Sequence, residues 1–311
     1  TTLVSHAEDY PSMPLTIVVA YGVGGSADRM TRAMSPYISA ELGQPVQVIN
    51  ISGAATLLGS NYLLSRPHDG YTLLASGFAP YLVNTILEGS ATYSIEDFAY
   101  LNFQWFDEDL YSLSKRSKYK AMPELLEAIR TTPGKVKVAA VRGSPGHLMA
   151  KLLLEVNDIP PENMNLVAYN SGGPARAAVA GGVVDLLVIS ANGCEGIREY
   201  ITPVAIGSDI PSETWKVPTL NQVLEPMGAK APLLPGTIRG FATSAEFKSN
   251  HPERFTILAN AIERALKNPE LQKQLQQLAI GGRWVGPEKS TETMHTTFEI
   301  FRDYSYLLEI N

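Results

Sequence analysis

The sequence is poor in residues that bind metals or form covalent cross-links: it has one cysteine, Cys194, and five histidines. A single cysteine excludes an intramolecular disulfide and argues against a zinc–thiolate cluster. No two histidines have the His-x-x-x-His spacing that places two ligands on one helix face. The sequence therefore predicts a protein without a metal site.

Long runs of one residue class are missing as well. No segment is rich in lysine and arginine, and the net charge is −6, so nucleic acid is not an expected partner. No stretch approaches the roughly 18–20 apolar residues of a membrane span. Residues 1–11 are polar and do not form a signal peptide, and we expect such a segment to have been removed or to lie outside this sequence.

The sequence is rich in alternating patterns. Of its 311 residues, 45% are hydrophobic, which is enough for two mid-sized domains. Short apolar runs alternate with segments whose apolar residues recur at three- and four-residue steps, and this predicts an α/β fold of parallel-rich sheets flanked by helices. Strands are expected at 15–20, 46–50, 71–76, 99–105, 110–114, 136–141, 166–168, 183–189, 204–207 and 237–243, and helices at 26–42, 54–65, 122–131, 144–156, 174–180, 252–267, 269–278 and 288–308.

A glycine-rich turn, Ala20-Tyr-Gly-Val-Gly-Gly-Ser-Ala-Asp-Arg29, connects the first strand to the first helix. Ser26 is the expected N-cap, Asp28 complements the helix dipole, and Pro36 predicts a kink. Similar strand–turn–helix segments recur at 50–56, 141–147 and 170–174. In open α/β sheets, ligands bind at the carboxyl ends of the strands, so these helix starts are predicted to form an anion site built mainly from neutral donors.

The same turn has other interpretations. Gly22, Gly24 and Ala27 satisfy the relaxed dinucleotide fingerprint, but Asn50 stands where that fingerprint requires an acidic residue. A P-loop is excluded because no Gly-Lys-Ser/Thr follows. A dinucleotide-binding oxidoreductase and a turn that only packs a helix on a strand stay open as alternatives.

No catalytic constellation emerges from the sequence. It has no Gly-x-Ser-x-Gly elbow, and the three-residue separation of Ser144 and His147 fits a cap with a first-turn donor better than a catalytic pair. Cys194 is interpreted as a small buried residue, and the acidic run 107–109 as a solvated cluster. The chain is therefore expected not to be an enzyme.

An ordered set of short motifs resembles one family, the substrate-binding proteins of tripartite tricarboxylate transporters, or Bug proteins. The resemblance runs from about Tyr10 to the C-terminus, and its specificity lies in the order and spacing of the motifs. These are Tyr10-Pro-Ser-Met-Pro14, Gly24–Asp28, Leu42-Gly-Gln-Pro-Val46, Asn50-Ile-Ser-Gly-Ala54, His68-Asp-Gly-Tyr-Thr-Leu-Leu74, Gly143–His147, Gly182-Val-Val-Asp185, Val217-Pro-Thr219, Asn268-Pro-Glu270 and Gly286-Pro-Glu288.

The resemblance implies a periplasmic two-lobed binding protein of type II-like fold, with a ligand cleft between the lobes that closes on a small organic carboxylate. It also implies membrane permease subunits as partners, a monomer, and no cofactor or reaction. A role as the ligand-sensing partner of a signalling protein is a further alternative.

The expected first lobe combines residues 1–112 with 237–311, and the second comprises 113–236. In the family, the loop after the first strand and loops of the second lobe hold one carboxylate. On the positions of this sequence, the predicted ligand-binding residues are Tyr21, Gly24, Gly25, Ser26, Ala27, Asp28, Ser76, Gly77, Gly143, Ser144, His147, Asn170, Ser171, Ser190 and Arg239.

Two positions depart from the family pattern. Ile189 and Ser190 stand where many relatives have an Asp-Asn pair, and Arg239 stands before Gly240 where relatives often have an aromatic residue. Arg239 either binds a second anionic end of the ligand or pairs with an acid on the lobe surface. The ligand is accordingly left open among aliphatic di- or tricarboxylates, aromatic carboxylates and amino acids.

Overall fold

The alternation of strands and helices predicted from the sequence is present along residues 9–308, the part of the chain that the computed structural model describes. The chain divides into two units. Unit 1 contains the residues up to Trp105 together with Ile238–His295, and unit 2 contains Phe106–Thr237 and the residues from Thr296 onward.

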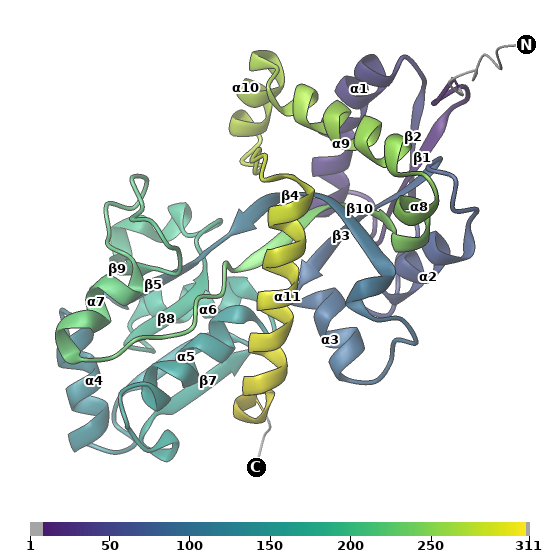
Figure 1. Ribbon diagram of the computed structural model, residues 1–311. Coiled ribbons are helices and arrows are strands. Elements are labelled where there is room, and N and C mark those ends of the chain that lie inside the picture. The colour runs from purple at the N-terminus through teal and green to yellow at the C-terminus, as the bar shows by residue number, and fades with distance from the viewer. Residues whose placement is uncertain (1–8, 309–311) are drawn as a thin grey trace, which may run out of the picture. The chain divides into compact units, whose positions relative to one another are not determined.

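Unit 1 is built on a five-stranded sheet in the order β2-β1-β3-β10-β4 (Figure 1). Parallel pairing joins β1 to β2 and to β3, whereas β10 runs antiparallel to β3. The five strands are β1 Leu15–Val19, β2 Val46–Asn50, β3 Thr72–Ala79, β4 Phe98–Asp107 and β10 Thr237–Ser244.

Helices cover both faces of this sheet. Alternate residues of β1, Leu15, Ile17 and Val19, share one core with the apolar faces of α1, α9 and α10, which gather on one side in Figure 1. The helices α2 and α3 pack on β3 and β1. The helices of unit 1 are α1 Ser26–Leu42, α2 Leu57–Ser65, α3 Tyr81–Leu87, α8 Ala245–Asn250, α9 Pro252–Leu266, α10 Pro269–Gln277 and the larger part of α11 Gly286–Tyr304.

Unit 2 has its own five-stranded sheet in the order β7-β6-β8-β5-β9. Its strands β6, β7 and β8 are parallel, and β5 is antiparallel to both β8 and β9. One core lies under α6, and α5 packs on β6 and β8. The elements are β5 Asp109–Ser114, α4 Met122–Thr131, β6 Lys137–Val141, α5 Pro145–Glu155, β7 Asn165–Tyr169, α6 Gly172–Gly181, β8 Leu186–Ser190, β9 Ile201–Ile206 and α7 Leu220–Leu224.

The observed division differs from the expected one in two respects. The expected boundary at residue 112 falls inside β5, which pairs along its length in the sheet of unit 2. The chain also passes between units three times, at 105/106, 237/238 and 295/296, because the end of the chain belongs to unit 2. There the 3-10 turn Ser305–Leu308 packs on α5, and Tyr306 donates a hydrogen bond to Glu155.

Three short helices, α3, α7 and α8, lie outside the predicted set. The first helix begins as predicted but is capped by Gly25 rather than Ser26, and it continues through Pro36. Among residues 9–308, no helix combines the length and the apolar character that crossing a membrane requires.

Candidate ligand site

The loop between β1 and α1 presents a helix start that no side chain caps. Gly25 occupies the N-cap position with extended backbone, φ −69° and ψ 169°. Gly24 has φ +85°, a conformation that favours glycine. Since the first amides of a helix have no intrahelical acceptor, the N–H groups at the start of α1 are available to an external anion.

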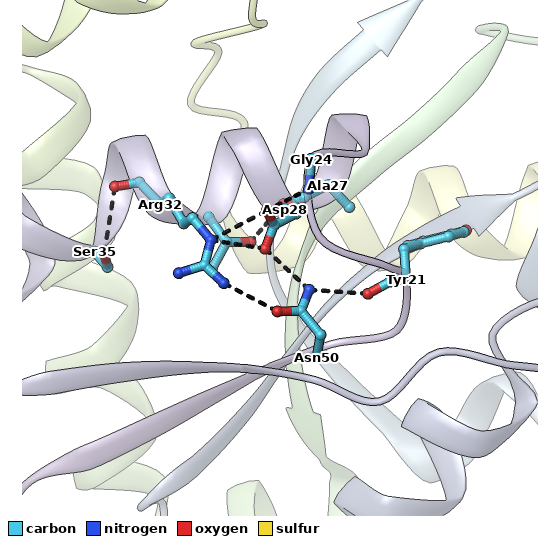
Figure 2. A network of polar contacts seen from close by, with 8 residues as sticks. Tyr21, Gly24, Ala27, Asp28, Arg32, Ser35 and Asn50 are labelled. Atoms are coloured by element: carbon cyan, nitrogen blue, oxygen red, sulfur yellow. Dashed lines mark hydrogen bonds and ion pairs between the residues drawn. The ribbon is translucent and has the colours of Figure 1, made fainter.

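Asp28 organises this loop from the inside (Figure 2). Its carboxylate is almost fully buried, at 2% exposure, and accepts hydrogen bonds from the Gly24 N–H at 2.8 Å, Arg32 Nε at 2.9 Å and Asn50 Nδ2 at 2.9 Å. Asn50 Nδ2 also donates to the Tyr21 carbonyl, and Arg32 Nη2 donates to Asn50 Oδ1. One polar network thus joins the loop after β1, the first turns of α1 and the end of β2.

This network changes the roles expected of three residues. Burial alone would raise the pKa of Asp28, but the Gly24 amide, Asn50 and Arg32 hold it below its ordinary value. The Gly24 N–H and the Asp28 carboxylate are therefore already bonded to each other, and Asp28 has only its own backbone amide to offer a ligand. The Asn50 amide is likewise bonded within the network, to Asp28, the Tyr21 carbonyl and Arg32. It therefore does not supply the ribose acceptor of a dinucleotide site.

A second cluster of predicted residues lies at Gly77 of β3. A Cβ atom there would clash with the Tyr21 hydroxyl, so this position requires glycine. The Ser76 side chain is fully buried beside it. Burial raises the pKa of Tyr21, and Tyr81 adds to this, whereas the positive charge of Arg239 opposes it.

Arg239 lies on β10 opposite Gly77, at a point where the strand pairing is irregular. Its guanidinium carbon is 4.5 Å from the centroid of the Trp105 ring, and Trp105 is only 4% exposed. This stacking holds the arginine beside Tyr21. That Arg239 binds a second carboxylate stays a prediction.

In unit 2, the start of α5 is closed by its own residues. Ser144 caps the helix as predicted, since its Oγ accepts the His147 N–H at 3.1 Å. The Gly143 N–H donates to His147 Nδ1 at 3.0 Å, so the neutral ring carries its proton on Nε2. Burial, and then the charges of Lys151 and Arg142, lower the pKa of His147 to about 4. His147 is therefore a neutral donor at pH 7.

The start of α6 lies next to the end of β8. Asn170 and Ser171 are exposed, Ser190 is half-buried, and Ser171 forms no capping bond. Cβ positions built on Gly146 of α5 and Gly172 of α6 fall within 2.5 Å of the Val188 carbonyl oxygen and 3.3 Å of an Ile189 methyl group, respectively. Both helix starts thus flank the carboxyl end of β8.

The acidic run 107–109 is not the solvated cluster that the sequence suggested. Asp109 is 2% exposed and Asp107 is 8% exposed, because this run leads into β5 at the interior of the sheet. Burial, and then the charges of Asp107 and Glu108, raise the pKa of Asp109 to about 8. Asp109 pairs with Ser190 across the strands, so a largely neutral carboxyl lies at the predicted edge.

Arg176 is a second residue that sequence reasoning missed. It follows Gly172 by four positions on α6, and helical side chains lean toward the N-terminus of their helix, so its guanidinium lies at the helix start. The spacing in Gly-Gly-Pro-Ala-Arg was the available signal.

Metal and thiol chemistry find little support in the described part of the chain. No group of three or more histidine, cysteine or acidic side chains is arranged to hold a metal ion within residues 9–308. Cys194 is buried, and burial raises the pKa of its thiol against the lowering effect of Arg176.

The predicted site residues therefore form two sets, each described within its own unit. The residues from Tyr21 to Asp28, with Ser76, Gly77 and Arg239, lie in unit 1. Gly143, Ser144, His147, Asn170, Ser171 and Ser190 lie in unit 2, near the ends of its parallel strands.

Two α/β units with mixed sheets define the class: the fold is that of two-domain periplasmic binding proteins. A family model described as the tripartite tricarboxylate transporter family receptor, TctC, matches residues 30–286, and the chain belongs to this family. It is a receptor family of periplasmic solute-binding proteins and not a family of enzymes.

Individual relatives agree with this assignment. Protein BugT of Bordetella pertussis is 27% identical over 271 residues, which cover 84% of this chain and 79% of BugT. A crystal structure of a TctC solute-binding protein from Polaromonas has a TM-score of 0.84 at 22% identity, covering 96% of this chain and 99% of that one. MatC from Rhodopseudomonas palustris, solved with bound malate, has a TM-score of 0.64 at 21% identity, covering 96% and 100%.

Proposed function

We propose that this protein captures a small organic carboxylate in the periplasm and, as a monomer, presents it to the permease subunits of a tripartite tricarboxylate transporter. The observation that carries the proposal is the uncapped start of α1, where the carboxylate of the first turn, Asp28, is turned inward and already bonded. A di- or tricarboxylate or an aromatic carboxylate is the proposed ligand class. The malate bound to MatC belongs to the first of these.

Neutral donors are sufficient for such binding. A helix N-terminus carries roughly half a positive charge, and a hydrogen bond to a charged group contributes about 1.5–3 kcal/mol. Three or four of these bonds reach the roughly 8 kcal/mol of micromolar affinity before ordering costs are subtracted. Because Asp28, Arg32 and Asn50 hold the loop in place beforehand, the ordering cost on binding is small.

Unit 2 offers donors of the same kind. His147 Nε2, the exposed Ser171 and the uncapped amides of α6 are neutral groups at the ends of parallel strands. We propose that they also contact the ligand, and substitutions in each set test the two contributions separately.

The direct experiment is a thermal-shift and calorimetric screen of carboxylates on the wild-type protein and on Gly25→Val. Gly25 has a backbone conformation that valine adopts readily, and a Cβ there meets only the Gly22 carbonyl oxygen at 3.4 Å. The variant should fold normally but lose most of its affinity, because the side chain blocks approach to the α1 amides.

Gly196→Val is the matched control, since Gly196 has no positive φ and open space around its Cβ position. It should bind like the wild type. NAD⁺ and NADP⁺ are included in the screen. Stabilisation by a dinucleotide, or unchanged carboxylate affinity in a folded Gly25→Val protein, would contradict the proposal.

A further inference from the structure

The guanidinium of Arg176 lies in a slot formed by two glycines. A Cβ atom on Gly172 would fall 2.7 Å from Arg176 Nη1, and one on Gly193 would fall 2.9 Å from its Cζ. Any other residue at either position would displace the guanidinium. The slot joins the start of α6 to the segment that follows β8, so the positive charge lies between Gly172 and the Asn192–Gly193 segment.

The protein itself does little to compensate this charge. Arg176 Nη2 donates to the Asn192 carbonyl at 2.8 Å, and this is its only hydrogen bond to oxygen among residues 9–308. Its Nε is buried and has no hydrogen-bond partner there, and no carboxylate forms an ion pair with Arg176 in that part of the chain. A guanidinium has five N–H donors, and leaving a buried donor unsatisfied costs about 1–3 kcal/mol.

The nearby acids do not neutralise Arg176. Asp107 Oδ1 accepts the Asn192 N–H at 3.0 Å, and the raised pKa of Asp109, about 8, keeps this second carboxyl largely protonated at neutral pH. Glu108 and Glu195 line a pocket together with Asn192 and Gly193, but neither forms an ion pair with Arg176 among residues 9–308. A ligand carboxylate at this edge would therefore meet a guanidinium that is not paired with an acid.

We infer that Arg176 binds a carboxylate of the ligand and makes the protein selective for dicarboxylates over monocarboxylates. This inference rests on the proposed function. An arginine forms two parallel bonds with a carboxylate, and holding the guanidinium in place beforehand reduces what must be ordered on binding.

The test compares malate with 3-hydroxybutyrate, which has a methyl group in place of one carboxylate, by calorimetry at fixed ionic strength. Arg176→Met should weaken the affinity for malate about tenfold or more and change the affinity for 3-hydroxybutyrate by less than about twofold. Gly172→Ala retains the charge of Arg176 but places a methyl group in the slot. It should also reduce the ratio of the malate affinity to the 3-hydroxybutyrate affinity. In an Arg176→Met background Gly172→Ala should have no further effect on that ratio.

Arg142→Met is the matched control. Arg142 follows β6 in the same unit and carries the same charge, but it is exposed, and its Nη2 contacts the Ala168 carbonyl at 3.5 Å. The substitution should leave the affinity ratio unchanged. A merely structural role of Arg176 in holding Asn192 would affect both ligands equally.

The outcomes separate the two proposals. If the wild type binds no carboxylate in the screen, the proposed function fails and this inference fails with it. If it binds malate, or another dicarboxylate tested against its own monocarboxylate analogue, and Arg176→Met leaves the ratio unchanged, only the inference fails. The inference is also overturned if only monocarboxylates bind, or if Arg239→Met abolishes the selectivity and Arg176→Met does not.

Discussion

At the scale of single residues, two buried aspartates have opposite electrostatic environments. Asp28 is surrounded by donors from three segments, which hold its pKa below the ordinary value and keep it ionised. Asp109 is equally buried, but its nearest charges are Asp107 and Glu108, and its pKa is about 8. One carboxylate therefore stabilises a loop, and the other is kept largely protonated at pH 7.

The Asp109 environment predicts a pH dependence of stability. An unfolded aspartate has its ordinary pKa, so between about pH 4 and 8 the folded protein binds one proton more than the unfolded chain. The free energy of unfolding should therefore fall as the pH rises, by up to about 1.4 kcal/mol per pH unit. Asp109→Asn should flatten this slope and stabilise the protein at pH 7.5.

Denaturant unfolding between pH 6.5 and 8 measures this effect. In that range His147, with its pKa near 4, is neutral in the folded state, whereas the unfolded histidine binds about half a proton at pH 6.5 and almost none at pH 8. This contribution opposes the Asp109 slope at the lower end, and it cancels when Asp109→Asn is compared with the wild type. Asp209→Asn, which alters an exposed aspartate of unit 2, is the control and should leave the slope as in the wild type. Equal slopes for Asp109→Asn and wild type would show that Asp109 is ionised at neutral pH.

At the scale of elements, the helix starts are completed in different ways. Ser144 closes α5 through its side chain, whereas α1 and α6 begin at Gly25 and Ser171 without a side-chain cap. In a capped start, a side-chain oxygen of the cap residue accepts a hydrogen bond from a first-turn amide. In an uncapped start, that amide stays available to a ligand. The α1 and α6 starts are therefore the stronger candidates for anion binding.

This difference predicts unequal effects of two similar substitutions. Ser144→Ala removes a capping acceptor and should lower the unfolding free energy of unit 2 by about 1 kcal/mol. Ser171→Ala removes a hydroxyl that caps nothing and should change stability by only a few tenths of a kcal/mol. Amide hydrogen exchange in α5 and α6 reports on each helix separately. Equal protection losses in both helices would contradict the assigned caps.

At the scale of the whole molecule, the net charge of −6 does not attract an anion, so local donors must supply the affinity. The described residues also present no cluster suited to a bridging metal ion. Ligand affinity is therefore expected to depend on hydrogen bonding and on fixed local charges.

Metal independence is the corresponding prediction. The dissociation constant of the tightest carboxylate from the screen should be the same in EDTA, in Ca²⁺ and in Mg²⁺ at constant ionic strength. The reason is that amides, hydroxyls and arginine bind a carboxylate directly. Loss of binding in EDTA with recovery on adding a divalent ion would show that a metal mediates the contact.

The local features of this protein were determined by the sequence. Apolar periodicity identified the long helices and most strands, and Ser144 was recognisable as a cap because capping depends on residues within one helical turn. The positions of the glycine-rich loops could also be predicted from the sequence, since a turn requires particular residue types at particular positions.

Only the tertiary structure decided how distant segments share an environment. Asp109 is buried because β5 lies between β8 and β9, and Asp28 is bonded because β2 brings Asn50 beside the first helix. Arg176 lies against Gly193 because the start of α6 packs beside the carboxyl end of β8, and the last turn of the described chain packs on α5 of unit 2. Such contacts depend on which strands become neighbours, and strand order is set by the packing of the whole sheet, which the spacing of residues along one segment does not encode.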